Sequence, residues 1–465
     1  MRRLAMLLAL VVAALWFGAG QAAAEESSGA SQDAGQSASS GQGAGAGGGA
    51  YQAGATNSAM NIRVLSPGNN GAVTQSNTTT AAGVAANSNT TDQSVGQSQT
   101  GGHGSDDAQI AGQSAKNDQS ASADATAVQL APRNSATSIR VLSPGNDGDV
   151  TQSNAATAGA VAANDNDTTQ SIDQSQTGGG SGSDNTQIAG QDSASRQSAD
   201  ADATAVQIKP SNEALSTRVL SPGNDGDVNQ SNSATAIGIA LNDNETTQSL
   251  DQSQMGGSPA YSENKGKGYG KGYGKGADYA QIAGQSASNR QSADADAVAV
   301  QVKPSNESSS IRVLSPGNEG DVKQSNSTTA IAAAKNDNDT TQSIDQDQTG
   351  RGGSGDYLQV AGQGSWSLQS AEAGALAFQL GASNENAPVR VGSPGGGGSV
   401  RQANTVVALA AALNGNATSQ SLMQTQSGYG SDSLQVAGQG SWNEQRAGAL
   451  ALALQVSLKP MKKRR

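Results

Sequence analysis

Residues able to carry out chemistry are scarce in this sequence. The chain has 465 residues, a single histidine and no cysteine. His103 stands alone in a Gly-rich segment, and no acidic pair differs from its copies elsewhere in the chain. General acid–base catalysis needs side chains of distinct role held close together, so we expect a protein that is not an enzyme.

Recurring carboxylates are the one pattern that could bind a metal. The motif GNDGDV and its copies hold Asp147, Asp149, Asp225, Asp227, Glu319 and Asp321. Calcium loops take oxygen ligands from Asp and Asn around a glycine turn. We favour a polar glycine turn, because the first and fifth copies read NNGAV and GGGGSV and lack these carboxylates. We therefore expect no cofactor, with calcium as the alternative interpretation.

Amide side chains form the most regular pattern in the chain. From Gln152 to Gln176 every second residue is Gln, Asn, Ala, Thr or Ile. Side chains two residues apart share a face only on an extended strand. Identical amides on stacked strands hydrogen-bond to one another, which satisfies groups that are costly to bury unpaired. The predicted ladder residues are Gln75, Asn77, Gln93, Gln152, Asn154, Gln170, Gln230, Asn232, Gln248, Gln324, Asn326, Gln342, Gln402, Asn404 and Gln420.

Five copies of one unit position these amides. IRVLSPGNNGAV at Ile62 recurs at Ile139, Thr217 and Ile311 and, in degenerate form, at Val389. Because each unit of a repeat protein buries a face on its neighbours, we predict an all-β fold, a β-solenoid of five repeats of ~78 residues. The repeats span residues 62–138, 139–216, 217–310, 311–388 and 389–456, and the third carries a Gly/Lys/Tyr insert at 261–279.

Each repeat divides into two halves that alternate in the same way. In the second half the face opposite the Gln/Ala positions carries Asp192, Arg196, Asp200 and Asp202, so the Gln/Ala face is the buried one. The segment Asn164–Asp167 reads NDND and favours a turn, which makes each half strand, turn, strand. The preceding SPGN is expected to form a corner. The ten halves then predict ten rungs.

The ends of the chain differ from the repeats. Arg2, Arg3, an apolar run and small residues at Ala22 and Ala24 are typical of a secretory signal peptide, residues 1–24. Residues 25–61 are rich in Gly, Ser, Ala and Gln and are expected to form a disordered leader, and residues 457–465 a basic tail. The mature protein is expected to be secreted, extracellular or at the cell surface, with no membrane span.

Two further features suggest contacts with other molecules. The insert holds four lysines and four tyrosines; it could bind polyanions, but a flexible solvated loop is the interpretation that its composition favours. Apolar residues on the outward parity of the last two repeats predict either a docking or lateral assembly surface or a cap covered by chain termini. These residues are Trp366, Leu376, Phe378, Trp442, Leu450, Leu452 and Leu454.

The segments QSNAATAGAVAANDNDTTQSIDQ and QIAGQDSASRQ resemble the curlin repeats of bacterial extracellular amyloid fibres, and the resemblance extends over about Ile62 to Val456. It implies a structural protein that self-assembles, with its own copies as partners, into fibres or a surface or biofilm matrix. The alternative is a monomeric solenoid binding module, an adhesin or ice-binding protein, whose outer Thr/Ser/Asp face binds a ligand such as a cell-surface polymer. A net charge of -12 makes nucleic acid a poor partner.

Overall fold

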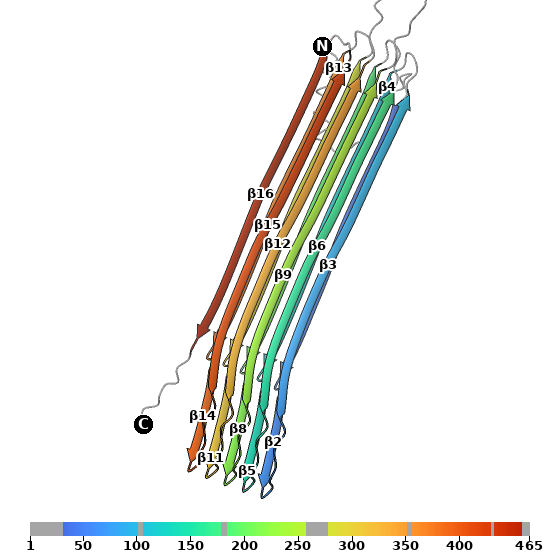
Figure 1. Ribbon diagram of the computed structural model, residues 1–465. Coiled ribbons are helices and arrows are strands. Elements are labelled where there is room, and N and C mark those ends of the chain that lie inside the picture. Colours follow the sequence, from blue (N-terminus) through green and yellow to red (C-terminus); the bar gives the residue numbers. More distant parts are fainter. Residues whose placement is uncertain are drawn as a thin grey trace, which may run out of the picture.

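Parallel β-sheets account for the fold. The computed structural model describes residues 31–100, 106–177, 184–256, 278–350, 356–428 and 432–457, and these contain β-strands and no helix. Sixteen strands form three parallel sheets, here called sheets A, B and C. Within each sheet the strands are stacked along the same axis (Figure 1). The predicted all-β solenoid is confirmed.

The long strands of sheet A lie on one side of the molecule. In spatial order they are β1 (Ser31–Ala53), β4 (Asp107–Leu130), β7 (Asn185–Ile208), β10 (Tyr279–Val302), β13 (Tyr357–Leu380) and β16 (Ser433–Val456). Sheet B consists of β14 (Ser383–Val391), β11 (Ser305–Val313), β8 (Ser211–Val219), β5 (Arg133–Val141) and β2 (Thr56–Val64). Sheet C consists of β15 (Val400–Ser427), β12 (Val322–Thr349), β9 (Val228–Met255), β6 (Val150–Thr177) and β3 (Val73–Thr100).

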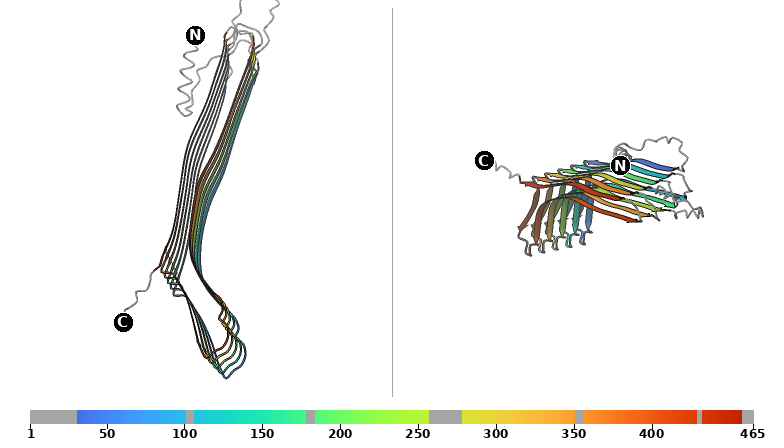
Figure 2. Two further views of the ribbon diagram at one scale, coloured as in Figure 1. Left: turned by 60° about the vertical axis from the view of Figure 1, so that its left-hand side comes forward. Right: turned by 90° about the horizontal axis from the view of Figure 1, so that it is seen from above.

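One rung of the solenoid uses one strand from each sheet. The chain runs down a strand of sheet A, continues through a short strand of sheet B, bends, and returns along a strand of sheet C (Figure 2). Five complete rungs are followed by β16, which is a half-rung. The first half of a repeat lies in sheet C and faces the second half, which lies in sheet A and begins the next rung. One repeat thus contributes one rung and not two, so the expectation of ten successive rungs is wrong.

The sequence repeat sets the register of every strand pair. Gln152 lies opposite Gln75 on one side and Gln230 on the other, at separations of 77 and 78 residues. Across the long insert the separation is 94 residues, yet Gln324 still lies opposite Gln230. Identical positions therefore stack along the whole axis, as amide ladders require.

Alanine and amide side chains fill the space between sheets A and C. The larger core cluster is composed of alanines, and a smaller one adds Ile172, Leu250 and Ile344. The sheets approach so closely that a Cβ atom at Gly83 would lie 2.4 Å from the backbone oxygen of Asp124. The exposed side chains of Asp192, Arg196, Asp200 and Asp202 point outward, which confirms that the Gln/Ala face is buried.

The predicted turn at Asn164–Asp167 is wrong. β6 passes through it without interruption, and Asn164 and Asn166 are buried. Both asparagines occupy alternate positions whose side chains point inward, so they hydrogen-bond in amide ladders. This pairing outweighs their preference for turns. The bend lies instead at the predicted SPGN corner, where Gly145 has a φ of 137°.

The expectation of a disordered leader at 25–61 is also wrong from Ser31 onward. β1 and β2 occupy this segment and form the first rung with β3. The insert ends earlier than expected, because Tyr279 belongs to β10 and stacks on Tyr357 with ring centroids 5.4 Å apart.

Several predicted segments lie outside the described residues. They are the signal peptide 1–24, His103, the insert residues 261–277 and the tail from residue 458. Within the described ranges the structure holds no helix that is long and apolar enough to cross a membrane.

Candidate assembly interface

The structure brings the fifteen predicted ladder residues together in three columns on sheet C. Neighbouring side chains along each column are joined by amide hydrogen bonds of 2.7–3.0 Å. The columns are Gln75–Gln152–Gln230–Gln324–Gln402, Asn77–Asn154–Asn232–Asn326–Asn404 and Gln93–Gln170–Gln248–Gln342–Gln420.

Gln170 illustrates how a buried amide is satisfied. It is 0% exposed, donates to Oε1 of Gln93 at 2.8 Å and accepts from Nε2 of Gln248 at 2.8 Å. Its second N–H donates to the backbone oxygen of Asp192 on the facing sheet at 3.2 Å. Each amide of the three columns links successive rungs. The Gln170 column also links sheet C to sheet A, whereas Gln152 and Asn154 donate to backbone oxygens of sheet B.

The ladders have a direction. Gln152 donates toward the N-terminal rung, to Gln75, and every further glutamine of the columns does the same. Asn154 donates toward the C-terminal rung, to Asn232, as do the other asparagines. The two ends of the stack therefore present complementary groups. The C-terminal end presents glutamine acceptors and asparagine donors, and the N-terminal end presents glutamine donors and asparagine acceptors.

Sequence reasoning missed the glutamine columns of sheet A at the N-terminus. Gln32, Gln36, Gln42 and Gln52 on β1 accept from Gln109, Gln113, Gln119 and Gln129 on β4. The signal was the spacing of four, six and ten residues, which is the same in both strands. It was hidden because glycines replace many of the alanines between the glutamines.

The short strands of sheet B contribute a column of their own. Asn134 donates to Asn212 at 2.9 Å and also to Asn154 of sheet C at 3.1 Å. Asn212 repeats this arrangement one rung further, with Asn306 and Asn232. This column fastens the beginning of each sheet B strand to sheet C.

A column of arginine and acidic residues lies inside the bend. Asp147 pairs with Nε of Arg140 at 2.7 Å and with Nη2 of Arg218 at 3.1 Å. Asp225 pairs in the same way with Arg218 at 2.7 Å and Arg312 at 3.1 Å. All three arginines are 0% exposed. Burial disfavours the charged form of Asp147, but Arg218, Arg140 and Ser138 outweigh it and hold the pKa of Asp147 below its usual value.

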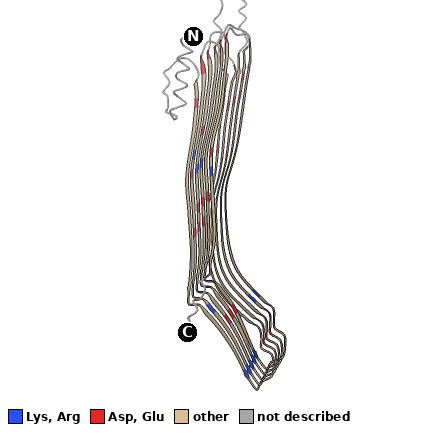
Figure 3. Ribbon diagram, turned by 90° about the vertical axis from the view of Figure 1, so that its left-hand side faces the viewer, with Lys and Arg blue, Asp and Glu red and all other residues tan. Residues whose placement is uncertain are grey.

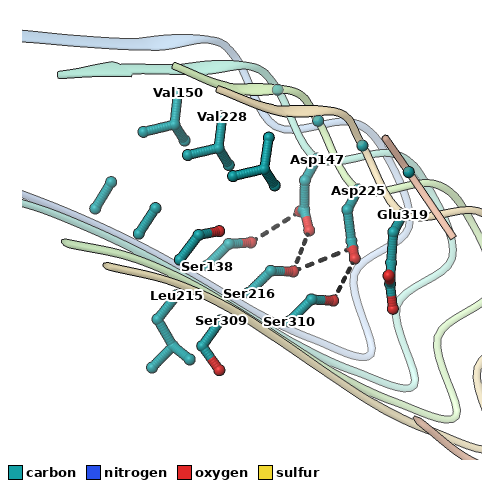
Figure 4. A pocket seen from close by; sticks show the side chains of 18 of the residues that line it. Ser138, Asp147, Val150, Leu215, Ser216, Asp225, Val228, Ser309, Ser310 and Glu319 are labelled. Atoms are coloured by element: carbon teal, nitrogen blue, oxygen red, sulfur yellow. Dashed lines mark hydrogen bonds between the residues drawn. The ribbon is translucent and has the colours of Figure 1, made fainter. Parts of the chain in front are cut away.

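The column borders a cavity of about 240 Å³ that extends past all five rungs. Figure 4 shows serine hydroxyls pointing at the carboxylates from one wall and valines such as Val150 lining another. The hydroxyl oxygen of Ser216 lies 3.0 Å from Asp147 and 3.1 Å from Asp225, so its single O–H is shared between the two carboxylates. The first carboxylate of the GNDGDV motif thus accepts hydrogen bonds from arginine and serine side chains. No cluster of three metal-binding side chains occurs among the described residues.

Carboxylates on the outer face of sheet A lie in unfavourable rows. Asp124, Asp202 and Asp296 stack in register, beside Asp200 and Asp294. Figure 3 shows acidic residues gathered along the long strands. Partial burial and the charges of these four neighbours raise the pKa of Asp202 to about 6. The outer face therefore carries mutual repulsion at neutral pH, in contrast to the paired acids of the bend.

Apolar side chains gather on the outer face of the last rungs. Trp366 and Trp442 stack with centroids 5.5 Å apart, and Arg290 lies over the Trp366 ring at 5.8 Å. Leu450 and Leu452 are 73% and 52% exposed. The described residues include no segment that covers these leucines as a cap.

Open strand edges border the first and last rungs. β1, β2 and β3 are the edge strands at the N-terminal end, and β16, β14 and β15 at the C-terminal end. Natural proteins usually shield long edges, because unpaired backbone N–H and C=O groups pair readily with other strands.

Comparison with models of known families, with characterised proteins and with solved structures found no match.

Proposed function

We propose that the mature chain is a secreted structural subunit that stacks end to end, through its open strand edges, into curlin-like extracellular fibres or a surface or biofilm matrix. The observation that carries this proposal is the uninterrupted register of the rungs up to both edges. If another rung of the same sequence were added at either end, its strands would pair in the same register as the strands inside the molecule.

The direction of the ladders favours head-to-tail stacking. Oε1 of Gln402 and an N–H of Asn404 point past the last rung of sheet C, where no further rung follows in the described chain. The corresponding positions in the first rung are Gln75 and Asn77, which offer the matching donor and acceptor. A contact that repeats head to tail without closing produces a filament.

The test uses the chain from residue 25 onward, incubated and examined by electron microscopy and fibre diffraction. We expect unbranched filaments and a reflection at ~4.8 Å along the fibre axis. A protein that stays a folded monomer under all conditions would contradict self-assembly and would favour the binding-module alternative.

A matched pair of variants makes this test specific. Gln439→Lys places an ammonium group on the inward face of β16, where it is solvated in the monomer and becomes buried when another copy stacks on it. Gly440→Lys adds the same charge to the outward face, where a new Cβ atom meets nothing within 4 Å. We expect both variants to fold and only Gly440→Lys to assemble. Filaments from Gln439→Lys would show that this edge is not the contact.

A further inference from the structure

The three sheets do not contain the same number of strands. Within the described residues sheet A has six, whereas sheets B and C have five each. If two copies stacked with β1 of one on β16 of the other, sheet A would continue, but sheets B and C would each lack one strand at the junction. The edges of β15 and β3 would then face each other across about 9.6 Å, two strand spacings, with their backbone groups unpaired.

Continuous sheets need only one of the two terminal strands of sheet A. β1 and β16 occupy equivalent positions: each lies in register beside its neighbour, and each has glutamines spaced by four, six and ten residues. With β16 of one copy seated on β4 of the next, all three sheets gain five strands per copy and every amide column continues.

β1 is the weaker of the two strands. Its sequence contains seven glycines against three in β16, and glycine weakens a strand through backbone entropy and missing side-chain contacts. Three of its four glutamines accept at 3.1–3.3 Å, whereas the corresponding bonds from β16 to β13 measure 2.7–2.8 Å; at the fourth position the order is reversed, with 2.7 Å for Gln52 and 3.1 Å for Gln455. β16 also stacks Trp442 on Trp366.

We infer that filament growth proceeds by strand exchange, in which β16 of one copy displaces β1 of the next and pairs with its β4. This inference rests on the proposed self-assembly. β1 then protects the N-terminal edge of the free monomer, and the last half-rung of each copy completes the first rung of its neighbour.

Cysteine cross-linking tests the exchange in the otherwise cysteine-free chain. Gly43, Ser120, Ser370 and Arg446 lie in one row on the outer face of sheet A, on β1, β4, β13 and β16. Single-cysteine variants are mixed in pairs, assembled, and treated with a thiol reagent that spans about 5 Å, one strand spacing. Exchange predicts links between Arg446→Cys and Ser120→Cys, at least tenfold above those between Arg446→Cys and Gly43→Cys.

Each other outcome has a distinct meaning. Filaments in which Arg446→Cys links to Gly43→Cys would overturn the exchange and leave the proposed self-assembly standing. Links between Gly43→Cys and Ser370→Cys would show that β16 is the displaced strand and would also overturn it. Failure of the unmodified chain to form filaments would overturn the proposed function itself, and the exchange with it.

Discussion

The neutral amide columns of sheet C differ from the charged column in the bend. The amide columns are complete in every rung and point beyond both ends of the stack. The charged column has an arginine in each rung but acids in only three, since Asn70 and Gly397 stand at the acidic position in the outer rungs. Arg63 accordingly donates to Asn70, and Arg390 to Glu319 of the preceding rung.

The difference suggests separate roles for the two regions. A neutral ladder can be extended by any number of identical rungs, because each amide both donates and accepts. A buried ion pair is expensive to desolvate, so it adds little net stability, and fixing a register is its best-attested role. We interpret the charged column as a lock on the register within one molecule, and the amide columns as the part that continues between molecules.

The largest expected effect comes from charging an amide column. Gln170→Lys buries an ammonium group without a partner and interrupts a column on both sides, so we expect a loss of about 4 kcal/mol in the free energy of unfolding. The control, Thr169→Lys, places the same charge on the outward face and should cost about 0.5 kcal/mol. Denaturant unfolding of the two variants gives the comparison. Equal losses would contradict the burial of the Gln/Ala face.

Breaking the charged column should cost somewhat less. Arg218→Met removes a guanidinium group shared by Asp147 and Asp225, and each carboxylate keeps one other arginine, so we expect a loss of about 3 kcal/mol. Arg390→Met, in the last rung, removes one pair that is partly exposed and should cost about 1 kcal/mol. If the column is a register lock, hydrogen exchange in Arg218→Met should rise along β5, β8 and β11 more than in sheet A. Uniform exchange would contradict that role.

A smaller effect is expected from pH. The pKa of Asp202 is raised to about 6 in the folded chain, so the folded state binds this proton more tightly than the unfolded state does. Stability should therefore rise as the pH falls from 7 through 6 toward 4. The pKa of Asp147 is lowered, so its contribution is present above about 3.8 and is lost as the pH falls further.

Thermal unfolding between pH 3 and pH 7 measures this balance. We expect the highest melting temperature between about pH 4 and 5. Asp202→Asn removes one of the repelling charges and should flatten the rise between pH 7 and 5. A melting temperature that falls steadily from pH 7 downward would show that the outer carboxylates do not repel one another.

The sequence predicted the strands and their register because both depend on local, repeated features. Alternation identified the inward positions such as Gln170, and the repeat length identified which residues stack. At Asn164–Asp167 the turn preference of Asn and Asp conflicts with the alternation. The structure follows the alternation, because Asn164 and Asn166 continue the series of inward side chains.

Other features could not be read from single segments. The pairing of Arg218 with Asp147, 71 residues away in the preceding rung, depends on how the bend stacks, which no local pattern states. Which sheet each half of a repeat joins also depends on long-range packing, so alternation alone does not show that the two halves lie in different sheets. Strand β1 was missed because its glycines hid the glutamine spacing that it shares with β4.

The axial repeat of a filament, measured by cryo-electron microscopy, tests the central claim most directly. If copies stack end to end with continuous sheets, each copy advances the filament by five strand spacings, about 24 Å. A repeat of about 29 Å would mean that all six strands of sheet A are kept, which leaves stacking intact but excludes strand exchange. Filaments whose axis is not parallel to the stacking direction of the rungs would contradict the account as a whole.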